Sequence, residues 1–287
     1  MAKGNLFLGT AARSVGDVVM YRHEGSQVSR VRVRKIANPK TDAQCKQRAI
    51  MAAVVKFYQP LASVLERSWQ GLSTTKSYAK FLAYNTKLAK ANNWYLPKST
   101  GFFPLRLKIS SGTLKGVDTS VNPTYAKFTL ASLDDRTEHI TTIGQISQMC
   151  INAGYKTGDI ITIIIALRDT NDKYSAYPIQ FAVNAADTNL LTTISGFFTI
   201  DLDGVESEDI KITSSIGEFR GIGVIVAREV DGSWKRSNCF FKTYFNDEEE
   251  IYPWTDEKIA AAIASYGNNA GDDNPLVYLD GDELDNA

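Results

Sequence analysis

Seven cationic side chains lie between residues 28 and 48, and their types and spacing suit contact with phosphate groups. Arg30, Arg32 and Arg34 alternate with valines, so in a β-strand their guanidinium groups share one face and repeat about every 6.6 Å. That repeat is close to two steps of a stacked nucleotide strand, at about 3.4 Å a step. The segment therefore predicts contact with a polyanion, because the planar guanidinium fork matches phosphate oxygens. A solvated strand face, or arginines paired with acids of the same or a neighbouring subunit, would give the same pattern.

A second set of cations belongs to a helix expected over residues 75–91. Lys76, Lys80, Lys87 and Lys90 fall on one face of that helix. Three aromatic residues in the same part of the chain, Tyr21, Tyr78 and Trp94, could stack on bases. The predicted nucleic-acid-binding residues, as phosphate ligands and not as base readers, are Arg30, Arg32, Arg34, Lys35, Lys40, Arg48, Lys76, Lys80 and Lys87.

The net charge of zero hides a large asymmetry along the chain. Residues 1–100 hold 17 Lys and Arg against 4 acids, a net +13, and the remaining residues hold 15 against 28, a net −13. The last 45 residues contain 12 acids and one Lys. Such polarity indicates either a polyanionic partner for the basic end, or attraction between the two ends within one chain or between neighbouring subunits.

An N-terminal hairpin and a pair of antiparallel helices are the elements expected to position these cations. Residues 12–36 read as two strands joined by the Gly-containing turn "HEGS". Thr41 and Gln44 form a capping-box pattern at the start of a helix. Pro60 is expected to break this helix, and the helix over 75–91 follows.

From about residue 100 the sequence is typical of an antiparallel β domain. Short β-branched or aromatic runs such as "DIITIIIALR" and "GIGVIVAREV" are separated by Gly and Asp turns. "VDGSWK" at 230–235 predicts a hairpin, because Asp-Gly readily takes the positive φ angles of a type I′ turn. One inserted helix is expected to end at Gly154, and a late helix is expected to begin after Thr255.

These features predict the α+β class. The expected order is a β-hairpin, an antiparallel helix pair, a mainly antiparallel β-sandwich or barrel-like domain with one inserted helix, a C-terminal helix and an acidic tail. The expected parts are residues 1–98 (basic hairpin and helices), 99–250 (β-rich domain) and 251–287 (helix and acidic tail).

The first 95 or so residues also carry a recurring pattern of glycines, basic residues and an N-P-x-T-x-x-Q-x-x-x-R helix start. Its members here are Gly9, Gly16, Tyr21, Arg22, Gly25, Arg32, Arg34, Asn38, Pro39, Thr41, Gln44 and Arg48. This stretch resembles an uncharacterised protein family of Bacteroidetes and of phages from gut metagenomes. The resemblance implies a phage or mobile-element protein and brings no assigned activity.

No residue pattern predicts catalysis. The two histidines, His23 and His139, lie outside any metal, Cys-His or nucleophile motif, and there is no P-loop. Cys45, Cys150 and Cys239 lie far apart and read as buried thiols in a reducing compartment. We therefore expect no enzyme activity and no cofactor.

An acidic stretch at residues 201–209, "DLDGVESED", is the best candidate for a metal site. Oxygen ligands for Ca²⁺ could come from Asp201, Asp203, Glu206, Glu208 and Asp209. The spacing does not follow the EF-hand pattern, and a solvated acidic loop after a strand explains it as well. No metal site is predicted.

Three functional hypotheses remain open. In the first, a non-enzymatic phage-type protein binds single-stranded nucleic acid or a packaged genome through its basic N-terminal region, without sequence preference, and self-associates into a homo-oligomer through its β domain. In the second, the chain is a virion component (capsid, tail or scaffold) whose basic and acidic ends pair between subunits. In the third, the chain is a β-sandwich adhesion or ligand-binding module in which the "DLDG" loop binds Ca²⁺.

The expected location is the cytoplasm of a bacterial host, or the virion. No apolar run reaches the roughly 18 residues that span a membrane, and the N-terminus does not resemble a signal peptide. We therefore expect no membrane partner.

Overall fold

The computed structural model of the 287-residue chain describes residues 2–3, 14–15, 18–23, 26–31, 41–130, 140–203, 208–245 and 255–267. The chain divides into two compact units, one that contains the N-terminal 41 residues and one that runs from Asp42 to Gly267.

The N-terminal unit contains a four-stranded antiparallel sheet of order β1-β4-β3-β2. Its strands are β1 (Ala2–Lys3), β2 (Ser14–Val15), β3 (Val18–His23) and β4 (Ser26–Val31). His23 lies opposite Ser26, so the hairpin predicted around "HEGS" is confirmed. The arginine-rich strand is described as far as Val31, and its continuation from residue 32 lies outside the described residues.

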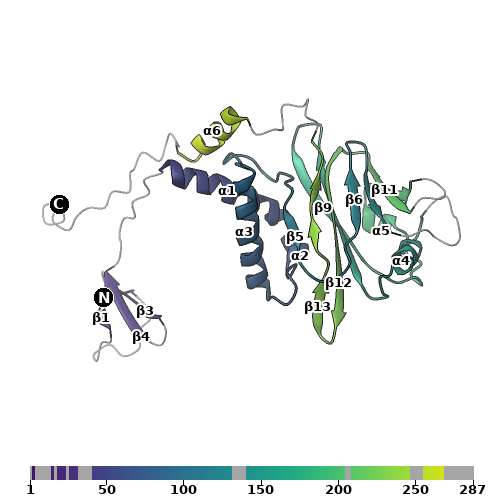
Figure 1. Cartoon of the computed structure of the whole chain (residues 1–287), viewed down its shortest axis with the longest axis horizontal. Helices are drawn as coiled ribbons and strands as arrows, with labels where there is room; N and C mark the ends of the chain where they lie inside the picture. Colours follow the sequence, from purple (N-terminus) through teal and green to yellow (C-terminus); the bar gives the residue numbers. More distant parts are fainter. Residues whose placement is uncertain are drawn as a thin grey trace. The chain divides into compact units, whose positions relative to one another are not determined.

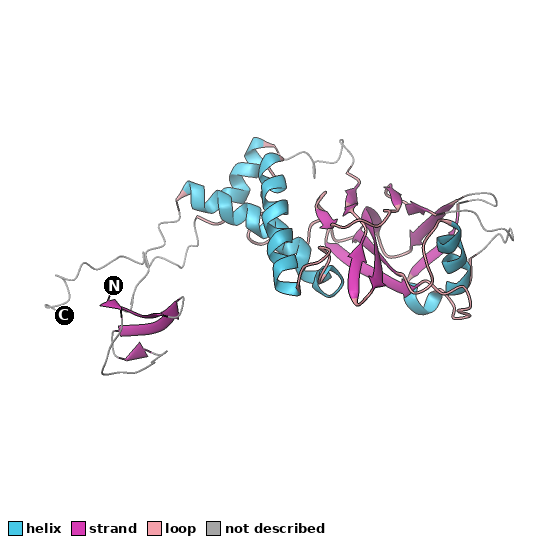
Figure 2. Ribbon diagram, turned by 60° about the horizontal axis from the view of Figure 1, so that its bottom comes forward, coloured by secondary structure: helices cyan, strands magenta, loops and turns pink. Residues whose placement is uncertain are grey.

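Helices form one layer of the second unit, shown beside the sheets in Figure 2. They are α1 (Asp42–Tyr58), the 3₁₀ turn η1 (Gln59–Leu61), α2 (Ala62–Leu65) and α3 (Thr74–Ala91). The helix start after Thr41 and the interruption at Pro60 are both confirmed, since α1 begins at Asp42 and ends at Tyr58. Proline lacks the backbone N–H that would continue the helix. The buried faces of α1 and α3 contribute Phe57 and Phe81 to one core.

Two antiparallel sheets form the other layers. The first has the order β13-β12-β8-β9, with β15 also paired to β12, and the second has the order β10-β11-β7-β6. A further pair joins β5 to β14. The bounds are β5 (Lys108–Ser110), β6 (Asp118–Val121), β7 (Ala126–Thr129), β8 (Ile160–Arg168), β9 (Tyr174–Ala182), β10 (Phe198–Leu202), β11 (Asp209–Ser214), β12 (Glu218–Val230), β13 (Ser233–Arg236), β14 (Cys239–Phe240) and β15 (Lys242–Thr243).

The sheet that contains β8 and β12 is the middle layer (Figure 1). Alternate residues of β8 belong to different cores: Ile163 and Ile165 face the second sheet, whereas Ile164 faces the helices. This explains why the run "IITIIIALR" is apolar throughout, because a strand covered on both faces has no solvent side. The sequence predicted the strand, and the helix layer explains its composition.

Glycines on the helix-facing side of β12 let another strand approach the middle sheet closely. A Cβ atom on Gly221 would lie 2.3 Å from Cε1 of Phe241, and one on Gly223 would lie 2.5 Å from Cδ1 of Ile109 and 3.0 Å from Cδ2 of the Phe241 ring. Phe241 is 1% exposed and meets the ring of Phe57 edge-on at 5.2 Å. The ring therefore fills the space that the two glycines leave and connects the sheet to the helices.

The remaining helices and one turn agree with the sequence. Helix α4 (Ile143–Asn152) starts with a capping box at Thr142 and is followed by Gly154, whose φ is 94°. The short α5 (Thr192–Ser195) precedes β10, and α6 (Asp256–Ala264) starts after the cap Thr255. Between β12 and β13, Asp231 and Gly232 have φ angles of 51° and 71°, so the predicted hairpin is confirmed.

The α+β architecture is confirmed, with a helix pair, several antiparallel sheets, an inserted helix and a C-terminal helix. The predicted part boundaries at residues 98 and 250 stay a prediction. Within the described residues, none of the helices has the length and apolar character that crossing a membrane requires.

We expect Gly221→Ala to destabilise the protein by about 1–3 kcal/mol, because the added methyl group has no space beside the buried ring of Phe241. Urea unfolding followed by circular dichroism measures the change. Gly101→Ala is the matched control, since a Cβ there meets nothing within 4 Å. Equal stabilities of the two variants would contradict the close packing of the Phe241 ring against Gly221.

Candidate nucleic-acid interface

Four lysines form a strip on the solvent face of α3. Lys76, Lys80, Lys87 and Lys90 are all exposed, and at 100° per residue they lie within an arc of about 80°. From the first to the last of them the helix rises about 21 Å. The buried residues of α3, among them Phe81 and Asn85, lie on the opposite side. We call these four residues the α3 lysine strip.

The α3 lysine strip is not neutralised by the described part of the fold. Residues 43–117 contain 12 Lys and Arg and a single acid, Glu66. Oε1 of Glu66 accepts a hydrogen bond from the Thr74 hydroxyl at 2.9 Å. Within the described ranges, no carboxylate forms an ion pair with any lysine of the strip. The strip is therefore open to an anionic partner.

Two half-exposed aromatic rings lie at the edge of this strip. Tyr84 and Phe240 are each 42% exposed, and their ring centroids are 6.4 Å apart. The Lys108 ammonium lies 5.2 Å from the centroid of Tyr84 and 5.5 Å from that of Phe240. On α3, Tyr84 is four residues after Lys80 and three before Lys87, so both lysines are its neighbours on the helix surface. We call Tyr84 and Phe240 the aromatic pair.

A buried amide fixes the strand that carries Lys108 against α3. The Asn85 side chain is fully buried, donates from Nδ2 to the Lys108 carbonyl at 2.9 Å, and accepts from the Lys108 N–H at 2.9 Å. Strand β5 then pairs with β14, with Lys108 opposite Phe240. Figure 1 shows β5 beside α3. Three segments far apart in the sequence thus meet at one place.

Other cations of the helix layer serve the fold itself. Lys46 forms an ion pair of 2.9 Å with Asp42 on the exposed surface of α1. Lys56 donates to the carbonyls of Pro97 at 3.1 Å and Lys98 at 2.8 Å, and also to that of Thr100. Burial lowers the pKa of Lys56. These two lysines are therefore less available to a partner than the α3 lysine strip.

The structure describes five of the nine residues that the sequence predicted as phosphate ligands. Lys76, Lys80 and Lys87 lie together on the strip, whereas Arg48 is half-buried on α1. Arg30 lies on β4, opposite Val19. The other predicted phosphate ligands, Arg32, Arg34, Lys35 and Lys40, lie outside the described residues.

Two of the three aromatic residues expected to stack on bases have another role. Trp94 is only 5% exposed and belongs to the core between helices and sheet, so its expected role was wrong. Tyr78 is half-buried, with its ring 4.7 Å from that of Tyr58. The side chain of Tyr21 lies outside the described residues. The exposed rings beside the α3 lysine strip are those of the aromatic pair, which sequence reasoning missed.

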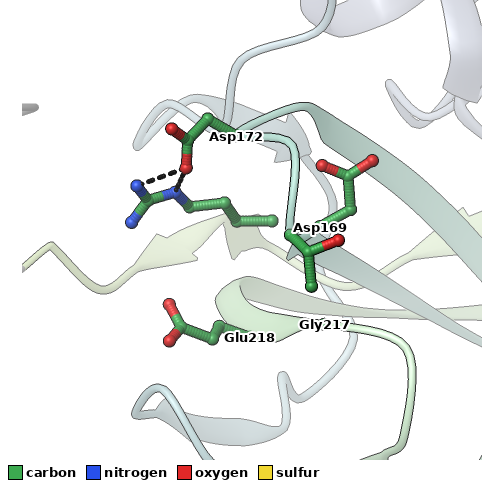
Figure 3. A pocket seen from close by; sticks show the side chains of 6 residues that line it. Asp169, Asp172, Gly217 and Glu218 are labelled. Carbon is green, nitrogen blue, oxygen red and sulfur yellow. Dashed lines mark hydrogen bonds and ion pairs between the residues drawn. The ribbon is translucent and has the colours of Figure 1, made fainter.

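A hollow of about 220 Å³ lies at turns of the β layers, but its acidic groups are already used (Figure 3). Asp172 accepts hydrogen bonds of 2.9 and 2.5 Å from Arg168, and Glu218 pairs with Arg220 at 2.5 Å. Oδ1 of Asp169 accepts from backbone N–H groups of its own turn. The acidic side chains that line the hollow therefore stabilise the turns that carry them. The hollow is lined by Arg168, Asp169, Thr170, Asp172, Gly217 and Glu218.

The acidic stretch at 201–209 does not gather into a calcium site in the residues that are described. Asp203 pairs with Lys127 and lies 3.6 Å from the Lys211 ammonium. The hydrogen bond from Lys127 lowers the pKa of Asp203. Asp209 accepts from the Thr129 hydroxyl at 2.6 Å. Glu206 lies outside the described residues, and among those described no three His, Cys, Asp or Glu side chains are grouped as metal ligands.

The three cysteines are free and buried, as the sequence predicted. Burial raises the pKa of Cys150 to about 12 and that of Cys239 to about 11. Because the thiolate is the reactive form, these two thiols are unreactive near neutral pH.

Comparison with known proteins brings one match. Residues 9–116 match the model of a family of unknown function (DUF6266). The match covers less than half of the chain and runs from the N-terminal unit through α3 to beyond β5, so it contains the α3 lysine strip and Lys108 but not Phe240. The chain matches none of the curated proteins and none of the solved structures compared.

We expect Asn85→Leu to destabilise the protein by about 1–3 kcal/mol for each group of Lys108 that it leaves buried without a partner. Amide exchange of Lys108 should become faster, because β5 loses its attachment to α3. Urea unfolding and hydrogen exchange measure the two effects. Asn92→Ala removes an exposed amide that bonds only to the preceding helical turn and should change stability by less than about 0.5 kcal/mol.

Proposed function

We propose that this protein binds nucleic acid through phosphate contacts and without sequence preference, using the α3 lysine strip. The observation that carries the proposal is the row of four exposed lysines with no ion pair to a described carboxylate. Lysine ammonium groups on flexible stems act as point charges, so they neutralise phosphates without reading bases.

The length of the strip matches a short segment of nucleic acid. About 21 Å of helix corresponds to about six steps of a stacked strand at 3.4 Å a step. The cationic residues of the N-terminal region, Arg30, Arg32, Arg34, Lys35, Lys40 and Arg48, add further positive charge in the same part of the sequence. The proposed ligand is a polyanion that contacts several cations at once.

The proposal places this activity in a non-enzymatic phage-type protein, in a bacterial cytoplasm or a virion. The resemblance of the first 95 or so residues to proteins of gut phages supports this setting. The family match over residues 9–116 brings no activity of its own.

Charge reversal of three strip residues, Lys76→Glu/Lys80→Glu/Lys87→Glu, should lower the affinity for an oligonucleotide at low salt by at least about tenfold. Four lysines that each neutralise one phosphate of a single strand give a slope of about −3 for log K against log salt. The slope should become shallower in the variant. Fluorescence anisotropy of a labelled oligonucleotide across a salt series measures both quantities.

The matched control is Lys156→Glu/Lys173→Glu/Lys235→Glu. These three lysines are also exposed, lie on the β layers, and change the net charge by the same amount. The control should retain most of the affinity. If both triple variants lose affinity equally, binding follows net charge alone and the α3 lysine strip is not the interface.

Self-association through the β layers is a second candidate function, with or without nucleic acid. Large apolar side chains are exposed on both sides of α5, with Leu190 54% exposed and Phe197 42% exposed, and Ile216 is 40% exposed. Exposed apolar groups favour burial against another surface. This feature supports a virion building block in which subunits contact one another through the β layers.

Light scattering after size-exclusion chromatography tests this candidate. We expect a mass above the 31.7 kDa of one chain, and a shift toward the monomer in Leu190→Ser/Phe197→Ser. High salt should also weaken the assembly if basic and acidic regions pair between subunits. A monomer at high protein concentration would contradict self-association.

A further inference from the structure

We infer that the aromatic pair is a base-stacking site that makes the interface select single-stranded over double-stranded nucleic acid. This inference rests on the proposed function and adds the class of ligand. The pair consists of Tyr84 and Phe240, whose rings lie 6.4 Å apart beside the α3 lysine strip.

The exposure of the two rings sets them apart from other aromatic residues of the helix layer. Phe57 and Phe81 are fully buried, and Phe241 is 1% exposed. Tyr84 and Phe240 are each 42% exposed, although Asn85 next to Tyr84 is buried and Phe240 lies between the buried Cys239 and Phe241. Packing in the core explains why the buried rings are aromatic, but it does not explain the exposed rings of the aromatic pair.

The surroundings of the aromatic pair supply charge of one sign. The Lys108 ammonium lies within 5.5 Å of both ring centroids, and Lys80 and Lys87 flank Tyr84 along α3. Because the Lys108 ammonium lies over a face of each ring, a base would stack on the other face of a ring or displace this flexible side chain toward its phosphate. In either case its phosphates would lie near these amines. Stacking on an aromatic face together with a basic groove is how proteins hold single strands without reading their sequence.

The chemistry of the pair favours a single strand as its occupant. In a duplex the faces of the bases are already stacked on their neighbours, so a half-exposed ring gains contact only after a base is extruded, at a cost of a few kcal/mol. A duplex can still contact the lysines through its phosphates. The two rings therefore add affinity only for unpaired bases, whether in DNA or RNA.

The backbone that carries both rings is held in place by contacts within the fold. Asn85, next to Tyr84 on α3, holds β5 through two hydrogen bonds of 2.9 Å. The pairing of β5 with β14 then places Phe240 opposite Lys108. Phe241, next to Phe240, is anchored in the core. Rigid rings lose little conformational freedom on binding, which favours affinity.

The test compares four labelled probes of equal length with the full chain: oligodeoxythymidine, oligouridine, a DNA duplex and an abasic oligomer. Anisotropy at low salt should show that the unmodified protein binds both single strands more tightly than the duplex. Tyr84→Ala/Phe240→Ala should weaken the binding of both single strands by about tenfold or more. Its affinities for the duplex and the abasic oligomer should change by less than about twofold.

Two further variants separate stacking from other effects. Tyr84→Phe/Phe240→Tyr keeps both rings and should bind single strands like the unmodified protein. Tyr125→Ala removes a half-buried ring on the β layers that also has two lysine ammonium groups near its centroid, at 4.7 and 4.8 Å, and should change no affinity. Circular dichroism and thermal unfolding of each variant confirm that it folds.

The outcomes distinguish this inference from the proposed function. If Tyr84→Ala/Phe240→Ala keeps its single-strand affinity while the strip charge reversal loses it, the stacking site is wrong and phosphate binding stands. Equal losses on single strand, duplex and abasic probe would also overturn the stacking site, because the rings would then act only by supporting the lysines. If the strip reversal changes nothing, the proposed function itself fails.

Discussion

The arrangement of the second unit depends on how closely one strand can approach the middle sheet. Residues 239–243 pair first with β5 and then with β12, and Phe241 lies where the partner changes. Its ring occupies space that side chains on Gly221 and Gly223 would fill, and it meets Phe57 of α1. Because adjacent residues of an extended segment point in opposite directions, the burial of Phe241 leaves Phe240 on the outside. The glycines of β12 thus indirectly position the candidate interface.

Cations in the helix layer divide into those that the fold uses and those that it leaves exposed. Lys56 satisfies backbone carbonyls that follow Trp94, and Lys46 pairs with an acid on its own helix. The lysines of α3 have no such partner among the described residues, and their charge is repeated along one face. A solvated helix face needs no acids to fold, but a run of 12 cations and one acid over residues 43–117 raises the cost of placing like charges together. An anionic partner would relieve that repulsion.

Features with a local cause could be predicted from the sequence, whereas contacts between distant segments could not. A few neighbouring residues explain the helix start after Thr41, the break at Pro60, the Asp231–Gly232 turn and the shared helix face of the strip lysines.

Trp94 shows the limit of such reasoning. Asn93 has a φ of 55°, and the chain turns so that the Trp94 N–H donates to the Ala89 carbonyl at 2.9 Å and the ring enters the core. The lysine-rich sequence around Trp94 had suggested that its ring lies on the surface. The pairing of β5 with β14 could not be predicted from the sequence either, because two short strands separated by more than 120 residues carry no periodic signal.

Rigid and flexible groups have complementary roles at the candidate interface. The backbones that carry Tyr84, Lys108 and Phe240 are held by buried hydrogen bonds and strand pairing, so the Cα positions of the two rings are fixed relative to each other. The lysines of the strip project on long stems from a helix whose opposite face is buried. Their amines can follow phosphates of different spacing, whereas the rings accept any base face. Neither contact reads the edges of bases, where sequence information lies. The same geometry that favours a single strand is therefore expected to leave the base sequence unread.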